Sequence, residues 1–110
     1  MSEGLKVWRS RMARTTRGAI FKAKRWFYSV YYNKSIPDEI KEKSKENWAR
    51  LARLLVEKSN AEGISDKAAT LTIYYYEKDG VFVPVGAEIE AYEIKPLKTV
   101  KISEEELASA

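Results

Sequence analysis

The sequence predicts a single α+β domain in which two main helices pack on one face of an antiparallel sheet of about four strands. At 110 residues the chain is long enough for one hydrophobic core and too short for two. Two segments of the first half repeat apolar residues at the helical period, and the second half alternates apolar and polar residues as strands do. Helices and strands that are segregated in this way are typical of an α+β domain. We expect this domain at 1–102, followed by a short C-terminal turn or tail at 103–110.

The N-terminal segment is expected to form a strand and then a helix. Residues alternate between Gly4 and Arg14 as in a strand, but the alternation leaves the facing of Trp8 open. Thr15 or Thr16 offers an oxygen to cap a helix that runs to about Tyr32. The positions of this helix that should face the core are Ala19, Ala23, Trp26, Phe27 and Val30.

A second helix should begin at Pro37, because proline suits the first turn of a helix. It should end near Asn60 and Gly63, since glycine and asparagine commonly terminate helices. Its apolar stripe is predicted to comprise Ile40, Ser44, Trp48, Leu51, Leu54 and Leu55.

Two alternating segments around residues 78–80 predict a β-hairpin. A two-residue Asp-Gly turn would pair Tyr76 with Val83 and place the two apolar sets on opposite faces, which conflicts with a single buried face. We therefore predict a three-residue Lys-Asp-Gly loop beside a bulge, which pairs Tyr75 with Val83.

This register places Tyr74, Tyr76 and Phe82 on the outer face of the sheet. Exposed aromatic residues form an oligomer interface or a platform on which bases stack. Alternatively, cross-strand aromatic pairs stabilise the sheet itself or lie beneath a helix. Beyond the hairpin, the alternation over 97–102 predicts a short last strand, and Ser103 with Glu106 forms a capping-box pattern for a final helical turn.

Composition excludes several chemistries. Cysteine and histidine are absent, so the chain holds no disulfide, thiol nucleophile, zinc finger or Ser-His-Asp triad. The best remaining catalytic candidates are Glu88, Glu90 and Glu93, but solvated strand carboxylates are far commoner than catalytic ones. We expect no enzyme, no cofactor and no metal.

Gln is absent while Lys and Glu are abundant, which favours a thermophilic source.

The formal net charge of +4 hides an asymmetry. Residues 1–35 hold nine bases and one acid, Glu3, for a net charge of +8, whereas residues 36–110 hold eleven bases and fifteen acids, for −4. Clustered Lys and Arg favour binding to a polyanion, because they release counterions from phosphates. The alternative is that the basic segment neutralises the acidic half, within one subunit or between subunits.

Bases and aromatic residues interleave from Lys22 to Lys34. This combination favours single-stranded nucleic acid, because cations follow the phosphates and flat side chains stack on unpaired bases. The candidate phosphate contacts are Arg9, Arg11, Arg14, Arg17, Lys22, Lys24 and Arg25, and the candidate stacking residues are Trp8, Tyr28, Tyr31 and Tyr32.

The chain resembles ThermoDBP and its related small proteins of hyperthermophilic archaea in three features: the Arg9/Arg11 segment, the basic aromatic helix Lys22–Lys34 and the hairpin TLTIYYYEKDGVFVPV. The resemblance covers about residues 4–102. It implies a helix-plus-sheet domain that binds single-stranded DNA and oligomerises, and it assigns no individual binding residue.

The sequence as a whole predicts a protein that binds single-stranded DNA, or alternatively RNA, with little sequence preference. We expect a homo-oligomer, either a dimer or a tetramer. The N-terminus has no secretory signal and no segment is apolar enough for a membrane helix, so we expect a cytoplasmic protein. The rival hypothesis is a non-enzymatic structural or virus-encoded interaction protein whose basic segment mediates oligomerisation.

Overall fold

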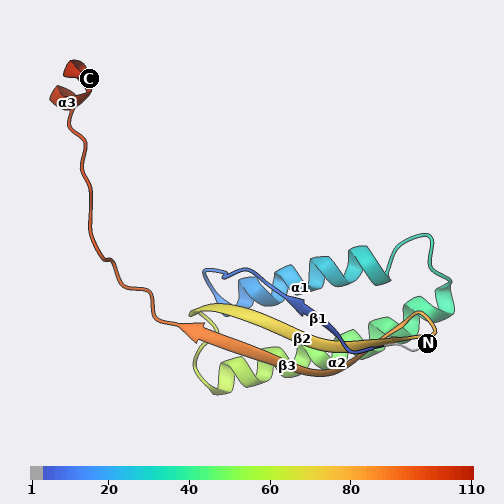
Figure 1. Cartoon of the computed structure of the whole chain (residues 1–110). Coiled ribbons are helices and arrows are strands. Elements are labelled where there is room, and N and C mark those ends of the chain that lie inside the picture. Colours follow the sequence, from blue (N-terminus) through green and yellow to red (C-terminus); the bar gives the residue numbers. More distant parts are fainter. Residues whose placement is uncertain (1–3) are drawn as a thin grey trace.

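A three-stranded antiparallel sheet carries two long helices on one face, in a computed structural model that describes residues 4–110 (Figure 1). Glu3 lies outside the described residues. The strand order is β1-β2-β3. The elements are β1 (Lys6–Arg9), α1 (Thr16–Tyr31), α2 (Asp38–Ala61), β2 (Ala68–Lys78), β3 (Val81–Tyr92) and α3 (Glu104–Ser109). The predicted α+β class, with two main helices on one face of an antiparallel sheet, is therefore confirmed.

The sheet has one strand fewer than expected. Residues 97–102, predicted to form the last strand, pair with no other strand in the described part of the chain. The first strand is short, and Leu5 and Val7 are 52% and 56% exposed, so neither belongs to the core.

The capping box of α3 is present, because Ser103 accepts from the backbone of Glu106 and the Glu106 carboxylate accepts from the backbone of Ser103.

The predicted hairpin register is wrong. The turn consists of Asp79 and Gly80 alone, which have positive φ values of 52° and 83° as the favoured two-residue hairpin turn requires. Tyr76 therefore pairs with Val83. The conflict between the two apolar sets is resolved further along, where a bulge leaves Val85 without a partner on β2.

The two-residue turn also places Phe82 in the core rather than on the outer face. Phe82 pairs with Glu77 and is fully buried beneath the helices. Beyond the bulge the register shifts by one residue, so that Ala87 and Ile89 pair with the buried Ile73 and Leu71. Apolar side chains from both halves of β3 thus face α1 and α2, although they do not follow one period of two.

The core is a cluster of aromatic rings between α1, α2 and the sheet. Phe27 stacks on Trp48 with 5.2 Å between ring centroids and meets Phe82 edge-on at 5.3 Å. Most residues predicted to face the core do so, but Val30 and Leu54 are 42% and 46% exposed.

Two side chains of α2 hydrogen-bond to the outer edge of β3 at Phe82. The Phe82 N–H donates to the Ser44 hydroxyl at 3.0 Å, and the Asn47 amide donates to the Phe82 carbonyl at 2.8 Å. Both Ser44 and Phe82 are fully buried. The hydroxyl at position 44 therefore satisfies a backbone donor that water does not reach.

We predict that Ser44→Ala lowers the free energy of unfolding by about 1–3 kcal/mol, because the buried Phe82 N–H loses its acceptor. Urea denaturation followed by tryptophan fluorescence measures this loss. Ser29→Ala is the matched control, since the Ser29 hydroxyl is exposed and bonds only to the carbonyl of Trp26 in its own helix. Equal stability of the two variants would contradict this account of the edge.

Candidate nucleic-acid interface

Helix α1 is anchored at its start and therefore presents one fixed side to solvent. The Thr15 hydroxyl accepts from the Gly18 N–H at 2.9 Å and caps the helix. The buried Thr16 hydroxyl donates to the Ile64 carbonyl at 2.7 Å, which ties the helix to the segment before β2. The side of α1 that faces the sheet and α2 consists of Thr16, Ala19, Ala23, Phe27 and Tyr31.

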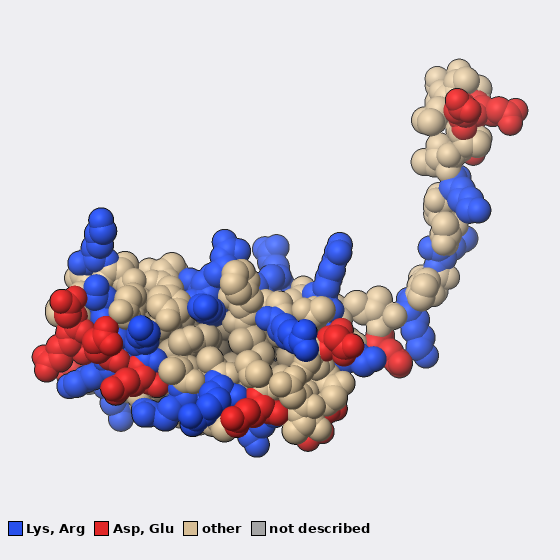
Figure 2. Space-filling model, turned by 180° about the vertical axis from the view of Figure 1, so that it is seen from behind, with Lys and Arg blue, Asp and Glu red and all other residues tan. Residues whose placement is uncertain are grey.

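The opposite side of α1 is basic. We call this surface the α1 basic face and define it by Arg17, Phe21, Lys22, Lys24, Arg25 and Tyr28. Its four bases are exposed, and none of them forms a salt bridge with any residue in the described range 4–110. Figure 2 views the helical side of the molecule, with Lys and Arg side chains standing along the edge that α1 forms. Their positive charge is thus available to a partner.

Phe21 is an exposed aromatic residue within this basic surface. Its side chain is 56% exposed. It lies four residues from both Arg17 and Arg25, so the three side chains form one row along the helix. The residues predicted from the sequence for this site did not include Phe21. The Arg-Phe-Arg spacing of four was the signal that could have found it.

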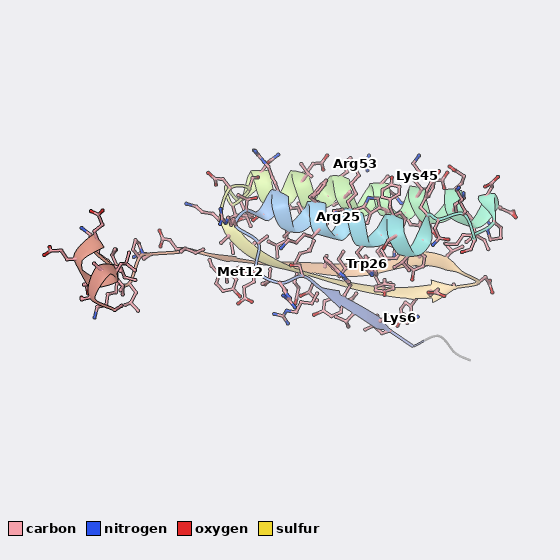
Figure 3. The ribbon with its side chains drawn as sticks, turned by 90° about the horizontal axis from the view of Figure 1, so that it is seen from above. Lys6, Met12, Arg25, Trp26, Lys45 and Arg53 are labelled. Atoms are coloured by element: carbon pink, nitrogen blue, oxygen red, sulfur yellow. The ribbon has the colours of Figure 1, made fainter. Side chains whose placement is uncertain are left out.

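Tyr28 and Tyr32 extend the surface toward α2. They meet edge-on at 5.3 Å, and both are half-buried. Lys41 and Lys45 of α2 lie over the Tyr32 ring at 5.2 and 5.6 Å. Figure 3 shows Lys45 and Arg53 on α2 on the side of the molecule away from the sheet. These α2 bases were missed because the sequence does not reveal that α1 and α2 lie side by side.

Trp8 faces the helices, which answers the question that the strand pattern left open. It pairs with Ile73, whose side chain is fully buried, and its ring stacks on Trp26 with 5.3 Å between centroids. Trp26 lies between α1 and the sheet (Figure 3). Together with Lys22, Arg25 and Ser29 it lines a shallow pocket beside the α1 basic face.

The other sequence-predicted residues are not all brought to this surface. Arg11 and Arg14 are exposed on the segment between β1 and α1. Arg9 lies at the other face of the sheet, where it pairs with Thr72 and forms an exposed 3.9 Å ion pair with Glu90. A strand that places Trp8 toward the helices necessarily points Arg9 away from them.

Three aromatic predictions have different outcomes. Tyr31 is only 4% exposed and belongs to the core, so it cannot stack on a base at the surface. The prediction that Phe82 lies on the outer face is wrong, because the two-residue turn pairs it with Glu77 on the face that the helices cover. Tyr74 and Tyr76 do lie on the open face, both half-buried, with Tyr74 covering Gly86 on β3.

The carboxylates of β3 serve local contacts. Glu88 accepts a 3.0 Å hydrogen bond from Tyr74, which raises the pKa of that tyrosine. Glu90 pairs with Arg9. These contacts give the two exposed carboxylates a structural role on the open face.

Tyr31, which is 4% exposed, donates a 2.8 Å hydrogen bond to the Glu77 carboxylate. Burial, followed by this hydrogen bond, raises the pKa of Tyr31 well above its ordinary value. The folded protein therefore keeps the Tyr31 proton at pH values where the unfolded chain has lost it.

We predict that Tyr31→Phe reduces the loss of stability at alkaline pH. A raised pKa in the folded state means that stability is fully present below the unfolded pKa, about 10, and falls as the pH rises above it. Denaturant unfolding at about pH 8 and about pH 11 should show a smaller fall for the variant. Tyr92→Phe, a change at a tyrosine outside the core, is the control. The same fall in Tyr31→Phe and the parent protein would contradict the prediction.

Comparison of the chain with protein-family models, curated proteins and solved structures finds no match. Among residues 4–110, no helix combines the length and the apolar character needed to cross a membrane.

Proposed function

We propose that this protein binds single-stranded DNA through the α1 basic face, with little sequence preference. The observation that carries the proposal is the row Arg17, Phe21 and Arg25, in which an exposed aromatic ring stands between two arginines that have no acidic partner within residues 4–110. The same proposal extends to RNA, because stacking and phosphate contacts do not require a particular sugar.

The two kinds of side chain have different roles. Arg17, Lys22, Lys24 and Arg25 contact phosphates, and Arg11 and Arg14 continue this path toward β1. Phe21 stacks on an unpaired base, with Tyr28 and Tyr32 as the next aromatic rings along the helix. Duplex DNA hides its bases and would engage the cations alone, so an exposed ring favours single strands.

We further propose that the protein has no catalytic activity, acts as a homo-oligomer and is cytoplasmic. A relationship to the ThermoDBP-related proteins agrees with this function and with the helix-plus-sheet domain.

A second function, that of a structural or virus-encoded interaction protein, has one observation in its favour. Two bases of the N-terminal segment pair with acids of the second half, Lys6 with Glu77 at 3.6 Å and Arg9 with Glu90 at 3.9 Å. The same complementarity between subunits would allow the basic segment to mediate oligomerisation. Both pairs are exposed and therefore weak, and they leave the α1 basic face unengaged.

Titration of labelled single-stranded and double-stranded oligonucleotides at several salt concentrations separates the two functions. We expect tighter binding of single strands and an affinity that falls as salt rises. Absence of binding at low salt would reject the nucleic-acid proposal and leave the interaction protein. Equal affinity for duplex and single strands would reject base stacking.

Phe21→Ala should weaken single-strand binding about fivefold to 150-fold, because one stacked base contributes roughly 1–3 kcal/mol. Fluorescence anisotropy with a labelled oligonucleotide measures the change. Val30→Ala is the matched control, since Val30 is an exposed apolar residue of the same helix outside the α1 basic face. If both variants bind like the parent protein, Phe21 has no role in binding.

A further inference from the structure

The chain beyond β3 stands away from the folded body. Residues 93–103 form neither helix nor strand and lead to α3, as Figure 1 shows. The molecule measures 64 × 34 × 23 Å and has a radius of gyration of 19.3 Å, whereas a compact domain of this length has about 13 Å. We call residues 93–110 the C-terminal arm.

The arm is rich in exposed apolar side chains. Leu97 is 100% exposed and Val100 is 79% exposed. The other large apolar residues of the arm are also in water, namely Ile94, Ile102 and Leu107. Removal of several such side chains from water is favourable, so a surface that covers them would hold the arm. The arm also contains no glycine and does not have the composition of a flexible linker.

An apolar groove of about 630 Å³ lies between α2 and β3. Its walls include Leu51, Leu54 and Ile64 from the helical side and Val85 and Ile89 from the strand. Leu54 and Val85 are about half exposed. β3 is an edge strand, and no other strand within residues 4–110 pairs with its outer side.

The arm fits this groove in length and pattern. Ile94, Leu97 and Val100 recur every three residues, which places them on one side of an extended chain with three residues per turn. Such a segment over 93–100 spans about 25 Å at 3.1 Å per residue. The part of α2 that lines the groove, from Asn47 to its C-cap Glu62, is about 24 Å long.

The charges also match when the arm runs antiparallel to β3. Lys95 and Lys98 then lie toward the end of the groove where Glu62 is a lining residue. The acids of α3 reach the other end of the groove, where Arg50 is a lining residue. Complementary charges fix the direction in which a segment binds.

We propose that the C-terminal arm of one chain lies in the α2–β3 groove of a second copy, and that the exchange is reciprocal in a two-fold symmetric dimer. In such a dimer the C-terminal ends of the two β3 strands meet at the two-fold axis, and the strands run in opposite directions. An arm that continues in the direction of its own β3 therefore enters the groove of the partner. To reach the groove of its own chain, the arm would have to reverse direction. This inference does not depend on nucleic-acid binding.

Sedimentation equilibrium at micromolar concentration tests the dimer. We expect the full chain at twice its 12.7 kDa mass. Leu97→Asp/Val100→Asp should give a monomer that keeps the parent's far-UV circular dichroism, because neither residue belongs to the core. Thr99→Asp/Ser109→Asp adds the same charge to the arm at polar positions and should remain a dimer. A monomeric full chain, or a dimer that persists in Leu97→Asp/Val100→Asp, would overturn the proposal.

Disulfide trapping identifies the occupant of the groove, and the cysteine-free chain allows it directly. A Leu54→Cys chain mixed with a Val100→Cys chain should form a covalent dimer on oxidation. A Phe21→Cys chain, which carries its thiol on α1, should not link to Val100→Cys. If the double variant Leu54→Cys/Val100→Cys instead closes within one monomeric chain, the arm binds its own groove and the exchange is rejected.

Discussion

Arg17→Gln/Arg25→Gln should weaken binding of a single-stranded oligonucleotide about 50-fold in about 50 mM salt. Each phosphate contact on a single strand contributes a salt slope of about −0.7, so the double variant should also have a slope that is smaller by about 1.4. Both arginines are exposed and neither forms a salt bridge within residues 4–110. Glutamine keeps a similar helix propensity, so the helix itself should not be weakened.

Titrations at four or more salt concentrations measure the affinity and its slope together. Lys43→Gln/Lys78→Gln is the control, because it removes the same charge from exposed positions outside the α1 basic face. The control should bind within about twofold of the parent protein if local contacts rather than net charge determine affinity. Equal losses in the two double variants would show that only net charge matters and would remove Arg17 and Arg25 from the interface.

Phe27→Ala should lower the free energy of unfolding by about 3–5 kcal/mol. Phe27 is fully buried and contacts the rings of Trp48, Phe82 and Tyr31. Removal of its ring opens a cavity that three rigid aromatic neighbours cannot fill. Since small domains are stable by only about 5–15 kcal/mol, this single change removes a large share of the total.

Phe21→Ala is the matched control for stability, because it makes the same substitution on the exposed side of the same helix. Guanidinium denaturation should find it within about 0.5 kcal/mol of the parent protein. The two phenylalanines should therefore show opposite behaviour, with stability lost at Phe27 and nucleic-acid binding lost at Phe21. Comparable stability losses in the two variants would contradict the assignment of Phe21 to the surface.

The helices could be predicted from the sequence because helical period and capping are local properties. Thr15 caps α1 as expected, and Ala19, Ala23 and Phe27 are buried as their spacing indicates. The ends of the helical stripes were less predictable. Val30 and Leu54 lie at positions that the period assigns to the core, but no neighbouring element covers them fully.

The bulge in β3 was beyond sequence reasoning, whereas the observed register beside the turn follows from Asp-Gly, a favoured two-residue hairpin turn. Strict alternation made the Asp-Gly turn look incompatible with one buried face. The unpaired Val85 removes that conflict, and burial of Phe82 against Phe27 and Trp48 supplies a physical reason for it. The bulge is stabilised by packing of β3 against the helices, which are distant in the sequence. A short segment of sequence therefore does not reveal it.

The candidate site was predicted in part. The basic character of α1 is visible in its composition, since charge does not depend on folding. The division of its aromatic residues into core and surface is not, because Phe21, Tyr28 and Tyr31 differ only in which side of the helix meets α2 and the sheet. Arg9 was separated from α1 for the same reason, as the facing of β1 depends on the stacking of Trp8 on Trp26.

The sequence by itself determined the α+β class, the two long helices and the basic N-terminal half, because period, capping and charge act over a few neighbouring residues. Only the tertiary structure decided the bulge at Val85, the burial of Tyr31 and Phe82, the exposure of Phe21 and the open groove beside β3. Each of these depends on contacts between residues far apart in the chain, and their free energy exceeds the local preferences that a sequence displays.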